Sequence, residues 1–370
     1  MRRVASLRPA IYYRRVHTLS AASGIRISPI RIVVCIGVLL LAISTEALAQ
    51  KNPAPGKLPA PRTGALPARV SLSPQFSPGQ VFRYAMEFET TTATTRSGLV
   101  SDPQGPSTLV ITWDATIRME VLPGEGGARG GIRLRTTYEK SAATVRTDTF
   151  DPAADATQKQ YRDLEGKVIE FTLDASGKVV SVSGIEGIVE GDKASLAARQ
   201  WIAQLGASAG APPGGVIVGQ TWSSDEPAST LPVAGMVWRT ETQYLRNEEC
   251  HPPNPDVPAE TPPADSANIT PTGEMCAVLL SRLNLVRPKA LRDPTPEEYR
   301  KNGVSTAGKW GGTAESLIFV SLRTGEVISI TQTGTEEMDI TMTSAQKTSI
   351  HYAGTIQSRS QVALLADAAP

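Results

Sequence analysis

Alternation of apolar and polar residues is the sequence feature that most limits what this chain can fold into. Between Ser107 and Leu122, apolar residues occupy every second position from Leu109 to Val121, and polar residues lie between them from Thr112 to Glu120. Successive side chains of a strand point to opposite faces, so this pattern predicts a strand with one buried face. The run is much longer than a typical strand of about five to six residues. We therefore expect long strands in a large, curved sheet.

A second alternating region, Ser316 to Ser344, predicts two strands joined at Arg323-Thr324-Gly325-Glu326. Gly325 provides the backbone freedom that a tight reversal needs. A helix would require apolar residues three and four apart, and Thr and Gly interrupt that spacing here. A similar strand–glycine–strand pattern spans Phe171 to Gly184. It indicates either two related β halves or two independent hairpins.

The predicted fold class is mainly β, with long antiparallel strands in a curved sheet. This sheet is expected to form a half-barrel or two related β halves, with two or three short helices. Helices are predicted at Ala153–Leu164, near 192–205, and at Thr295–Asn302. We expect Asp293 or Thr295 to cap the last helix and Gly303 to end it.

The first 49 residues have the pattern of an export signal. Seven Arg residues precede an apolar run at 32–43, and Ala47-Leu48-Ala49 matches the small-x-small cleavage pattern. The apolar run is shorter than the roughly 20 residues that a helix needs to cross a bilayer. We expect a cleaved signal peptide at 1–49 and a periplasmic or extracellular location. An inner-membrane anchor through residues 32–43 is the alternative.

Composition divides the rest of the chain into three parts. Residues 50–79 are rich in Pro and Ala and predict a disordered linker, because they contain too little apolar surface to repay ordering. A first β-rich half is expected at 80–205 and a second at 216–365, separated by a Gly/Pro stretch. The second half contains a Pro-rich loop at 251–272.

Charge argues against a nucleic-acid partner. Cleavage after Ala49 would remove seven of the 37 Lys and Arg residues and one of the 36 Asp and Glu residues, which leaves a net charge of about −5. No basic cluster then remains to neutralise phosphates.

Cys250 and Cys276 are the cysteines that remain after such cleavage. In an oxidising compartment they are expected to form a disulfide that closes the Pro-rich loop. The alternative is metal ligation by Cys250, His251 and Cys276, but this spacing matches no standard zinc pattern. We therefore expect no metal or cofactor.

Candidate catalytic residues are few. Ser349 and His351 lie two apart on a predicted strand and would share a face, so they could form a Ser–His pair; a half-exposed strand histidine is the alternative. Adjacent residues on a strand point to opposite faces, so consecutive acids do not form a glycosidase-type carboxylate pair. Such acidic pairs occur at Glu248-Glu249, Glu297-Glu298 and Glu336-Glu337. We commit to no catalytic residue.

Large apolar side chains are the candidates for a binding surface. They either line an apolar pocket or form ordinary core, and the set consists of Phe82, Tyr84, Met86, Trp113, Met119 and Trp238. The export signal, the long strands and a helix that could plug the concave side together resemble the half-barrel lipoprotein carriers of the LolA and LolB type. The segment Val218-Gly219-Gln220-Thr221-Trp222 is also similar to a V-G-x-x-W element of secreted β-rich bacterial proteins.

These patterns favour an exported, non-catalytic envelope protein. Its curved sheet is expected to bind a lipid or another apolar small molecule, or an envelope protein. The alternatives are a secreted hydrolase that uses acidic residues or Ser349 and His351, and a structural cell-surface domain on a Pro-rich tether.

Overall fold

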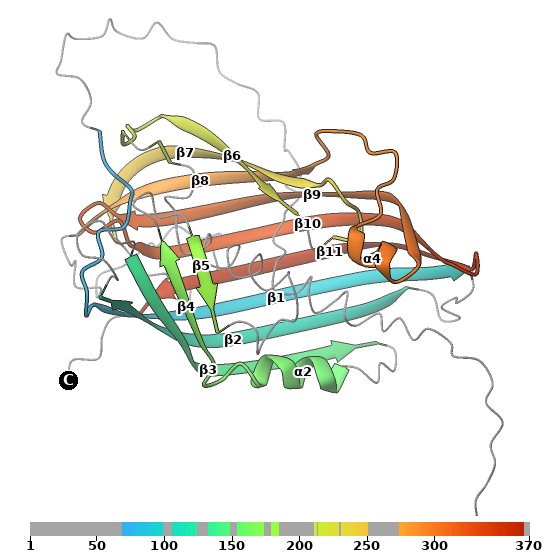
Figure 1. The fold of residues 1–370 in the computed structure, drawn as a ribbon. Helices are drawn as coiled ribbons and strands as arrows, with labels where there is room; N and C mark the ends of the chain where they lie inside the picture. Colours follow the sequence, from blue (N-terminus) through green and yellow to red (C-terminus); the bar gives the residue numbers. More distant parts are fainter. Residues whose placement is uncertain are drawn as a thin grey trace, which may run out of the picture.

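The structure is a computed structural model that describes residues 69–98, 106–123, 132–148, 154–173, 179–184, 211–212, 214–228, 231–250 and 274–365. Within these ranges the chain forms one sheet of 11 strands, in the order β5-β4-β3-β2-β1-β11-β10-β9-β8-β7-β6 (Figure 1). Every neighbouring pair is antiparallel. The sheet does not close, because β5 and β6 form its two edges. The predicted mainly β class is confirmed.

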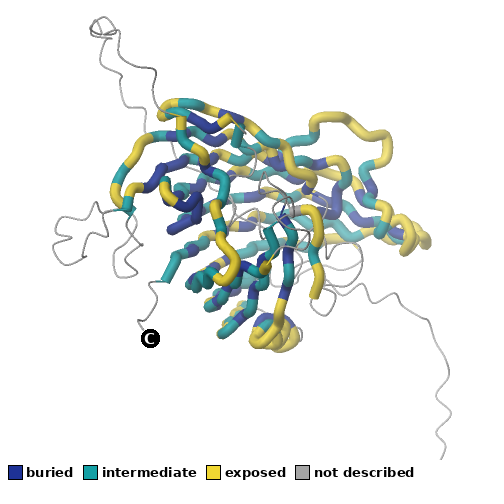
Figure 2. The backbone as a smooth tube through the Cα atoms, turned by 60° about the vertical axis from the view of Figure 1, so that its left-hand side comes forward, coloured by how far each residue is buried: buried dark blue, intermediate teal, exposed yellow. Residues whose placement is uncertain are grey.

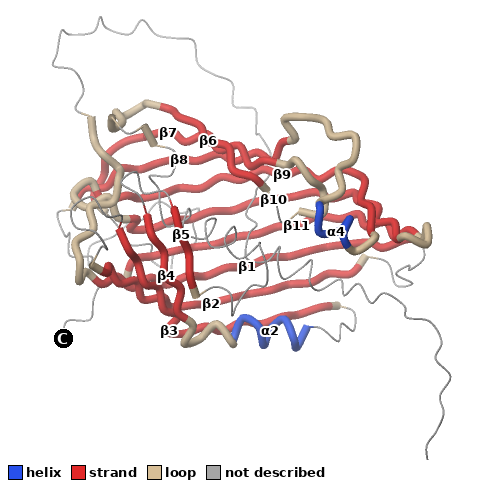
Figure 3. Tube along the Cα trace, viewed as in Figure 1, coloured by secondary structure: helices blue, strands red, loops and turns tan. Residues whose placement is uncertain are grey.

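Two meanders join at the middle of the sheet. β1 to β5 run outward in chain order on one side, β11 back to β6 do so on the other, and β1 pairs with β11. The strands are β1 Val81–Gly98, β2 Ser107–Leu122, β3 Ile132–Thr147, β4 Val168–Leu173, β5 Val179–Ser183, β6 Thr221–Pro227, β7 Val237–Glu249, β8 Met275–Val286, β9 Val304–Ser321, β10 Val327–Ser344 and β11 Ser349–Leu364. The short strands β4 and β5 lie across the front of the long ones (Figures 1 and 3).

The predicted hairpin turn is confirmed. β9 ends at Ser321 and β10 begins at Val327, with Gly325 at a positive φ of 70° between them. The β4–β5 hairpin that resembles it in sequence lies at an edge of the sheet, whereas β9 and β10 lie in its interior. The two hairpins therefore occupy different positions in the sheet.

The two faces of the sheet differ in composition. Buried residues alternate along the strands (Figure 2), and those on the buried side include Tyr84, Ile117 and Ile340. We call this side the inner face. The outer face carries charged residues in cross-strand ion pairs, such as Arg135 with Glu170 at 2.9 Å. Surface ion pairs of this kind contribute at most about 1 kcal/mol each to stability. Burial of apolar side chains on the inner face is therefore the main source of stability.

Buried side chains form three clusters. The first cluster lies on β1 to β4, β10, β11 and α2. It comprises Tyr84, Met86, Phe88, Ile111, Trp113, Ala115, Ile117, Met119, Val121, Leu134, Tyr138, Tyr161, Ile169, Phe171, Leu173, Val327, Ile330 and Val362. The second cluster comprises Ala228, Leu231, Val233, Met236, Trp238, Leu285, Val304, Trp310, Ala314, Ile340, Met342 and Ile356. The third comprises Leu72, Val216, Trp222, Tyr244, Ala277, Leu279 and Val320.

Two predicted helices are present. Helix α2, Ala154–Arg162, lies on β3 and buries Tyr161 against Trp113, with ring centroids 5.6 Å apart. Helix α4, Glu297–Lys301, ends before Gly303, which has a positive φ as predicted. The predicted cap is wrong: Pro296 occupies the N-cap and no side chain caps the helix. The reason is that Asp293 accepts a hydrogen bond from the Thr295 amide, which lies before the helix.

The last part of the predicted linker at 50–79 contacts the rest of the described chain. Val70 forms a bridge with Val216, and the amide of Gln75 donates to the Thr324 carbonyl at 2.7 Å. Leu72 is buried in the third cluster. The predicted signal peptide at 1–49, the helix near 192–205 and the Pro-rich loop at 251–272 lie outside the described residues.

Candidate functional site

A row of polar residues crosses the inner face between apolar clusters. Cross-strand pairing places these residues side by side on five consecutive strands, in the order Ser360, Gln332, Ser316, Ser281 and Thr242. Thr242 and Ser281 share a hydrogen bond of 2.8 Å between their hydroxyl groups. Buried polar groups are costly unless hydrogen-bonded. The inner face is therefore not a uniformly apolar core.

Glu336 lies four residues after Gln332 on β10, on the same face. Its cross-strand partners are Ile356 on β11 and Gly312 on β9, and only 1% of the residue is exposed. The indole Nε1–H of Trp310 donates to Glu336 Oε2 at 2.6 Å. The second oxygen, Oε1, is buried and has no hydrogen-bond partner among the described residues. One of the two carboxyl oxygens thus has a hydrogen-bond partner among the described residues, and the other has none.

The electrostatics of Glu336 follow from its burial. Desolvation raises the pKa of Glu336 from 4.5 to about 8, and the Trp310 hydrogen bond opposes part of this rise. The carboxyl group is therefore mainly protonated at neutral pH. In that form it has one O–H donor and remaining acceptor capacity.

Gly312 makes room for this carboxyl group. A Cβ at Gly312 would lie 2.6 Å from Glu336 Cγ and 3.2 Å from the ring of Trp238. Gly312 has no positive φ, so its role is steric. Glycine within a strand commonly marks such a close approach. Glu336, Gly312, Trp238 and Trp310 form the candidate site.

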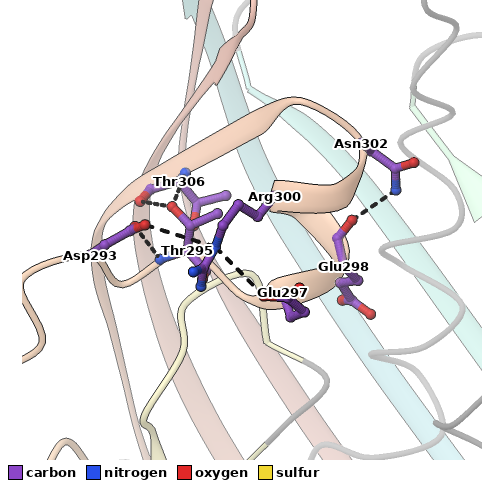
Figure 4. A network of polar contacts seen from close by, with 7 residues as sticks. All are labelled: Asp293, Thr295, Glu297, Glu298, Arg300, Asn302 and Thr306. Carbon is purple, nitrogen blue, oxygen red and sulfur yellow. Dashed lines mark hydrogen bonds and ion pairs between the residues drawn. The ribbon is translucent and has the colours of Figure 1, made fainter.

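The connection from β8 to β9 packs against the second cluster through Tyr299. Thr295 Oγ1 accepts a hydrogen bond from the Thr306 amide on β9 at 3.0 Å and donates to its carbonyl, and Arg300 donates to the Thr295 carbonyl at 2.9 Å (Figure 4). Pro294 accepts a backbone hydrogen bond from Ala234 at 2.6 Å. This hydrogen bond links residues 231–236, which precede β7, to residues 287–303, which connect β8 to β9.

The predicted apolar set separates into two regions. Tyr84, Met86, Trp113 and Met119 belong to the first cluster, and Phe82 packs against it. Trp238 belongs to the second cluster. These residues thus do not line one common pocket, and five of the six are core of the α2 side.

The Ser349–His351 pair, one of the two alternatives that the sequence left open, is not formed. The Ser349 hydroxyl shares a hydrogen bond with Thr343 Oγ1 at 2.9 Å. His351 instead lies between Asp339 Oδ1, 2.9 Å from Nε2, and Ser97 Oγ, 3.4 Å from Nδ1. The serine that contacts His351 comes from β1, 254 residues away in sequence. This exposed Ser97–His351–Asp339 group lies on the outer face.

Cys250 and Cys276, the pair named from the sequence, form a disulfide with a Cα–Cα distance of 5.0 Å. It joins the ends of β7 and β8 at the base of the Pro-rich excursion. In the described part of the chain, no three His, Cys, Asp or Glu residues lie close enough to hold a metal ion. The described helices include none that is long and apolar enough to cross a membrane.

Sequence reasoning missed Glu336 as a site residue, although a signal was present. Met338, Ile340 and Met342 alternate on one face, and Glu336 continues this series toward the N-terminus. The prediction that Glu336 and Glu337 point to opposite faces is consistent with the structure, where Glu336 is buried and Glu337 is exposed. An acid in the apolar register of a strand was therefore the clue.

Comparison with known proteins gives only faint similarity. No protein-family model and no curated protein matches the chain. The solved structure of lipovitellin, whose title concerns lipid–protein interactions, aligns over 80% of this chain and 26% of its own, with 10% identity and a TM-score of 0.38. This chain thus spans about a quarter of lipovitellin.

Two bacterial structures align less well. DynF from the dynemicin biosynthesis pathway of Micromonospora chersina aligns over 86% of this chain and 95% of its own, with 8% identity and a TM-score of 0.17. An outer membrane channel from Pseudomonas putida F1 aligns over 79% of this chain and 98% of its own, with 7% identity and a TM-score of 0.16. None of the three is a lipoprotein carrier of the type that the sequence resembles.

Proposed function

We propose that this protein is an exported, non-catalytic protein that binds an apolar ligand on the inner face of its open sheet. The observation that carries the proposal is the half-satisfied carboxyl group of Glu336 among Trp310, Trp238 and Gly312. A core that served packing alone would gain stability from an apolar residue at this position. Binding pockets combine mainly apolar walls with a small number of placed polar groups, and this is the composition found here.

Export is part of the same proposal. It is supported by the Arg-rich start, the apolar run at 32–43 and the Ala47-Leu48-Ala49 pattern. The Cys250–Cys276 disulfide agrees with an oxidising compartment, since disulfides persist mainly outside the cytosol. Mass spectrometry of the protein recovered from the periplasm or medium should give a chain that begins at Gln50.

Binding can be tested with a purely apolar probe that quenches tryptophan. Purified protein is titrated with 1-bromohexadecane in a mild non-ionic detergent, and indole fluorescence is recorded. We expect saturable quenching that falls strongly when Trp238 and Trp310 are both replaced by Phe. Replacing Trp113 by Phe is the matched control and should leave the quenching at the site intact. Absence of saturable quenching would refute an apolar binding site.

A second candidate function is hydrolysis on the outer face. The observation that favours it is the Ser97–His351–Asp339 arrangement, in which three strands supply the residue types of a hydrolytic triad. Against it, the Asp339 side chain is 70% exposed, whereas the aspartate of such triads is buried. Turnover of p-nitrophenyl esters that disappears in Ser97→Ala would favour this function over ligand binding alone.

A further inference from the structure

Polar side-chain atoms are also buried on other described residues, but Glu336 differs from them. Thr136, Tyr161 and Thr306 carry neutral hydroxyl groups. Arg287 and Glu298 are only partly buried as residues, whereas 1% of Glu336 is exposed. A hydroxyl group is uncharged whether it is buried or exposed. A buried carboxyl group costs much more free energy once it is ionised. Glu336 also points to the inner face, where the proposed ligand would lie, from the middle of a central strand.

The existing hydrogen bond determines what the free oxygen can do. Oε2 accepts the Trp310 indole proton at 2.6 Å and so acts as the carbonyl-type oxygen of the protonated acid. The proton then resides on Oε1, which becomes an unpartnered donor. An acceptor carried by a molecule with an apolar body would suit this buried position among apolar side chains.

The surroundings disfavour a charged partner. On the described strands, the charged side chains that the register places on this face, apart from Glu336, all lie toward strand ends or on an edge strand. They are Glu226 on β6, Glu249 at the end of β7 and Arg96 near the end of β1. The partly buried aromatic side chains that pack against the second cluster are Tyr299 on α4 and Tyr352 on β11. Bringing an ammonium group here would desolvate two ions, whereas a carbonyl oxygen requires no buried charge.

We propose, resting on the ligand-binding function above, that Glu336 is a specificity residue that donates a hydrogen bond from Oε1 to the carbonyl oxygen of an acyl ester. The ligand class is a lipid whose chains lie along the apolar inner face and whose ester group reaches Glu336. Trp310 holds the carboxyl group in the donating orientation, and Gly312 provides the space beside it. Binding involves no covalent step, and the proton remains on Glu336.

The test compares three ligands of equal chain length by competition against 1-bromohexadecane. They are methyl palmitate, hexadecane and hexadecylamine, each measured at pH 6 and pH 9. We expect methyl palmitate to bind about tenfold more tightly than hexadecane at pH 6, as one buried hydrogen bond provides. At pH 9 this advantage should largely disappear, because Glu336 has lost the proton that it donates.

Variants separate the hydrogen bond from general packing. Glu336→Gln keeps an N–H donor at the same place and should retain the ester preference at both pH values. Glu336→Met should abolish the preference at both and still bind hexadecane. Glu337→Gln, on the outer face, is the matched control and should behave as the unmodified protein.

Three outcomes overturn the assignment without touching the proposed function. These are equal affinity for methyl palmitate and hexadecane at pH 6, an ester preference that survives in Glu336→Met, and tighter binding of hexadecylamine at pH 9 that Glu336→Gln removes. The last would assign the site to ammonium ligands. Failure of 1-bromohexadecane to bind at all would instead refute the apolar binding site itself.

Discussion

Two tryptophans of the inner face each donate a hydrogen bond to a buried polar side chain, but only one of these networks is closed. Trp113 donates to Ser141 Oγ at 2.9 Å, and Ser141 donates in turn to the Tyr161 carbonyl at 2.6 Å. Trp310 donates to Glu336, whose second oxygen has no partner in the described chain. The first arrangement fastens α2 to the sheet. The second leaves Glu336 Oε1 without a partner in the described chain. This free oxygen distinguishes the candidate site from the core around Trp113.

The pH dependence of stability should give the largest contrast between the two regions. Burial raises the pKa of Glu336 from 4.5 to about 8. Between these pH values the folded protein keeps a proton on Glu336 that the unfolded chain has already released. The stability that this proton provides is complete below pH 4.5 and is lost as pH rises through 8. Relative to Glu336→Gln, the unmodified protein should lose about 4 kcal/mol of unfolding free energy over that range. Urea unfolding at a series of pH values measures this, and parallel curves for the two proteins would contradict it.

Opening the closed network should have the next largest effect. Ser141→Ala leaves the Trp113 indole and the Tyr161 carbonyl without their partner in a buried position. We expect a loss of about 2–3 kcal/mol in unfolding free energy, because unpaired buried polar groups keep their desolvation cost. The loss should be the same at pH 5 and pH 8, which distinguishes it from the Glu336 effect. A loss that changes with pH would show that the two regions are coupled.

Filling the space beside Glu336 should cost less. Gly312→Ala places a Cβ 2.6 Å from Glu336 Cγ, and we expect a loss of about 1–2 kcal/mol from overpacking. Gly311→Ala is the matched control, since nothing lies within 4 Å of a Cβ at that position. Thermal or urea unfolding of both variants gives the comparison. Equal stability of the two would mean that Glu336 is not confined by Gly312.

The outer face should give the smallest effect. Ser97 and His351 are exposed, so Ser97→Ala should change the unfolding free energy by less than about 0.5 kcal/mol. It should also leave 1-bromohexadecane binding unchanged, because the inner face carries that site. A binding defect in this variant would move the ligand to the other side of the sheet.

Much of the fold was predictable, because strand alternation is a local signal. The runs at Ser107–Leu122 and Ser316–Ser344 predicted β2, β9 and β10, and Gly325 predicted the turn between them. The pairing of β1 with β11 was not predictable, since it joins strands from opposite ends of the described chain. No local pattern reports such long-range contacts.

The site was less predictable than the fold. Glu336 is visible in sequence only as an acid in an apolar register, and its partners Trp310 and Gly312 lie on another strand, in register with it only after β9 and β10 pair. The Ser97–His351 contact requires β1 to meet β11. Sites built across strands depend on register, which a single sequence does not specify.

Direct titration of the Glu336 carboxyl group tests the distinction between an open and a closed network most directly. Infrared difference spectra between the unmodified protein and Glu336→Gln isolate the C=O stretch of this one acid. The structure predicts a protonated carboxyl band at pH 6 that converts to carboxylate with a midpoint near pH 8. A carboxylate band already complete at pH 6 would contradict it, because Glu336 would then be ionised and unable to donate from Oε1.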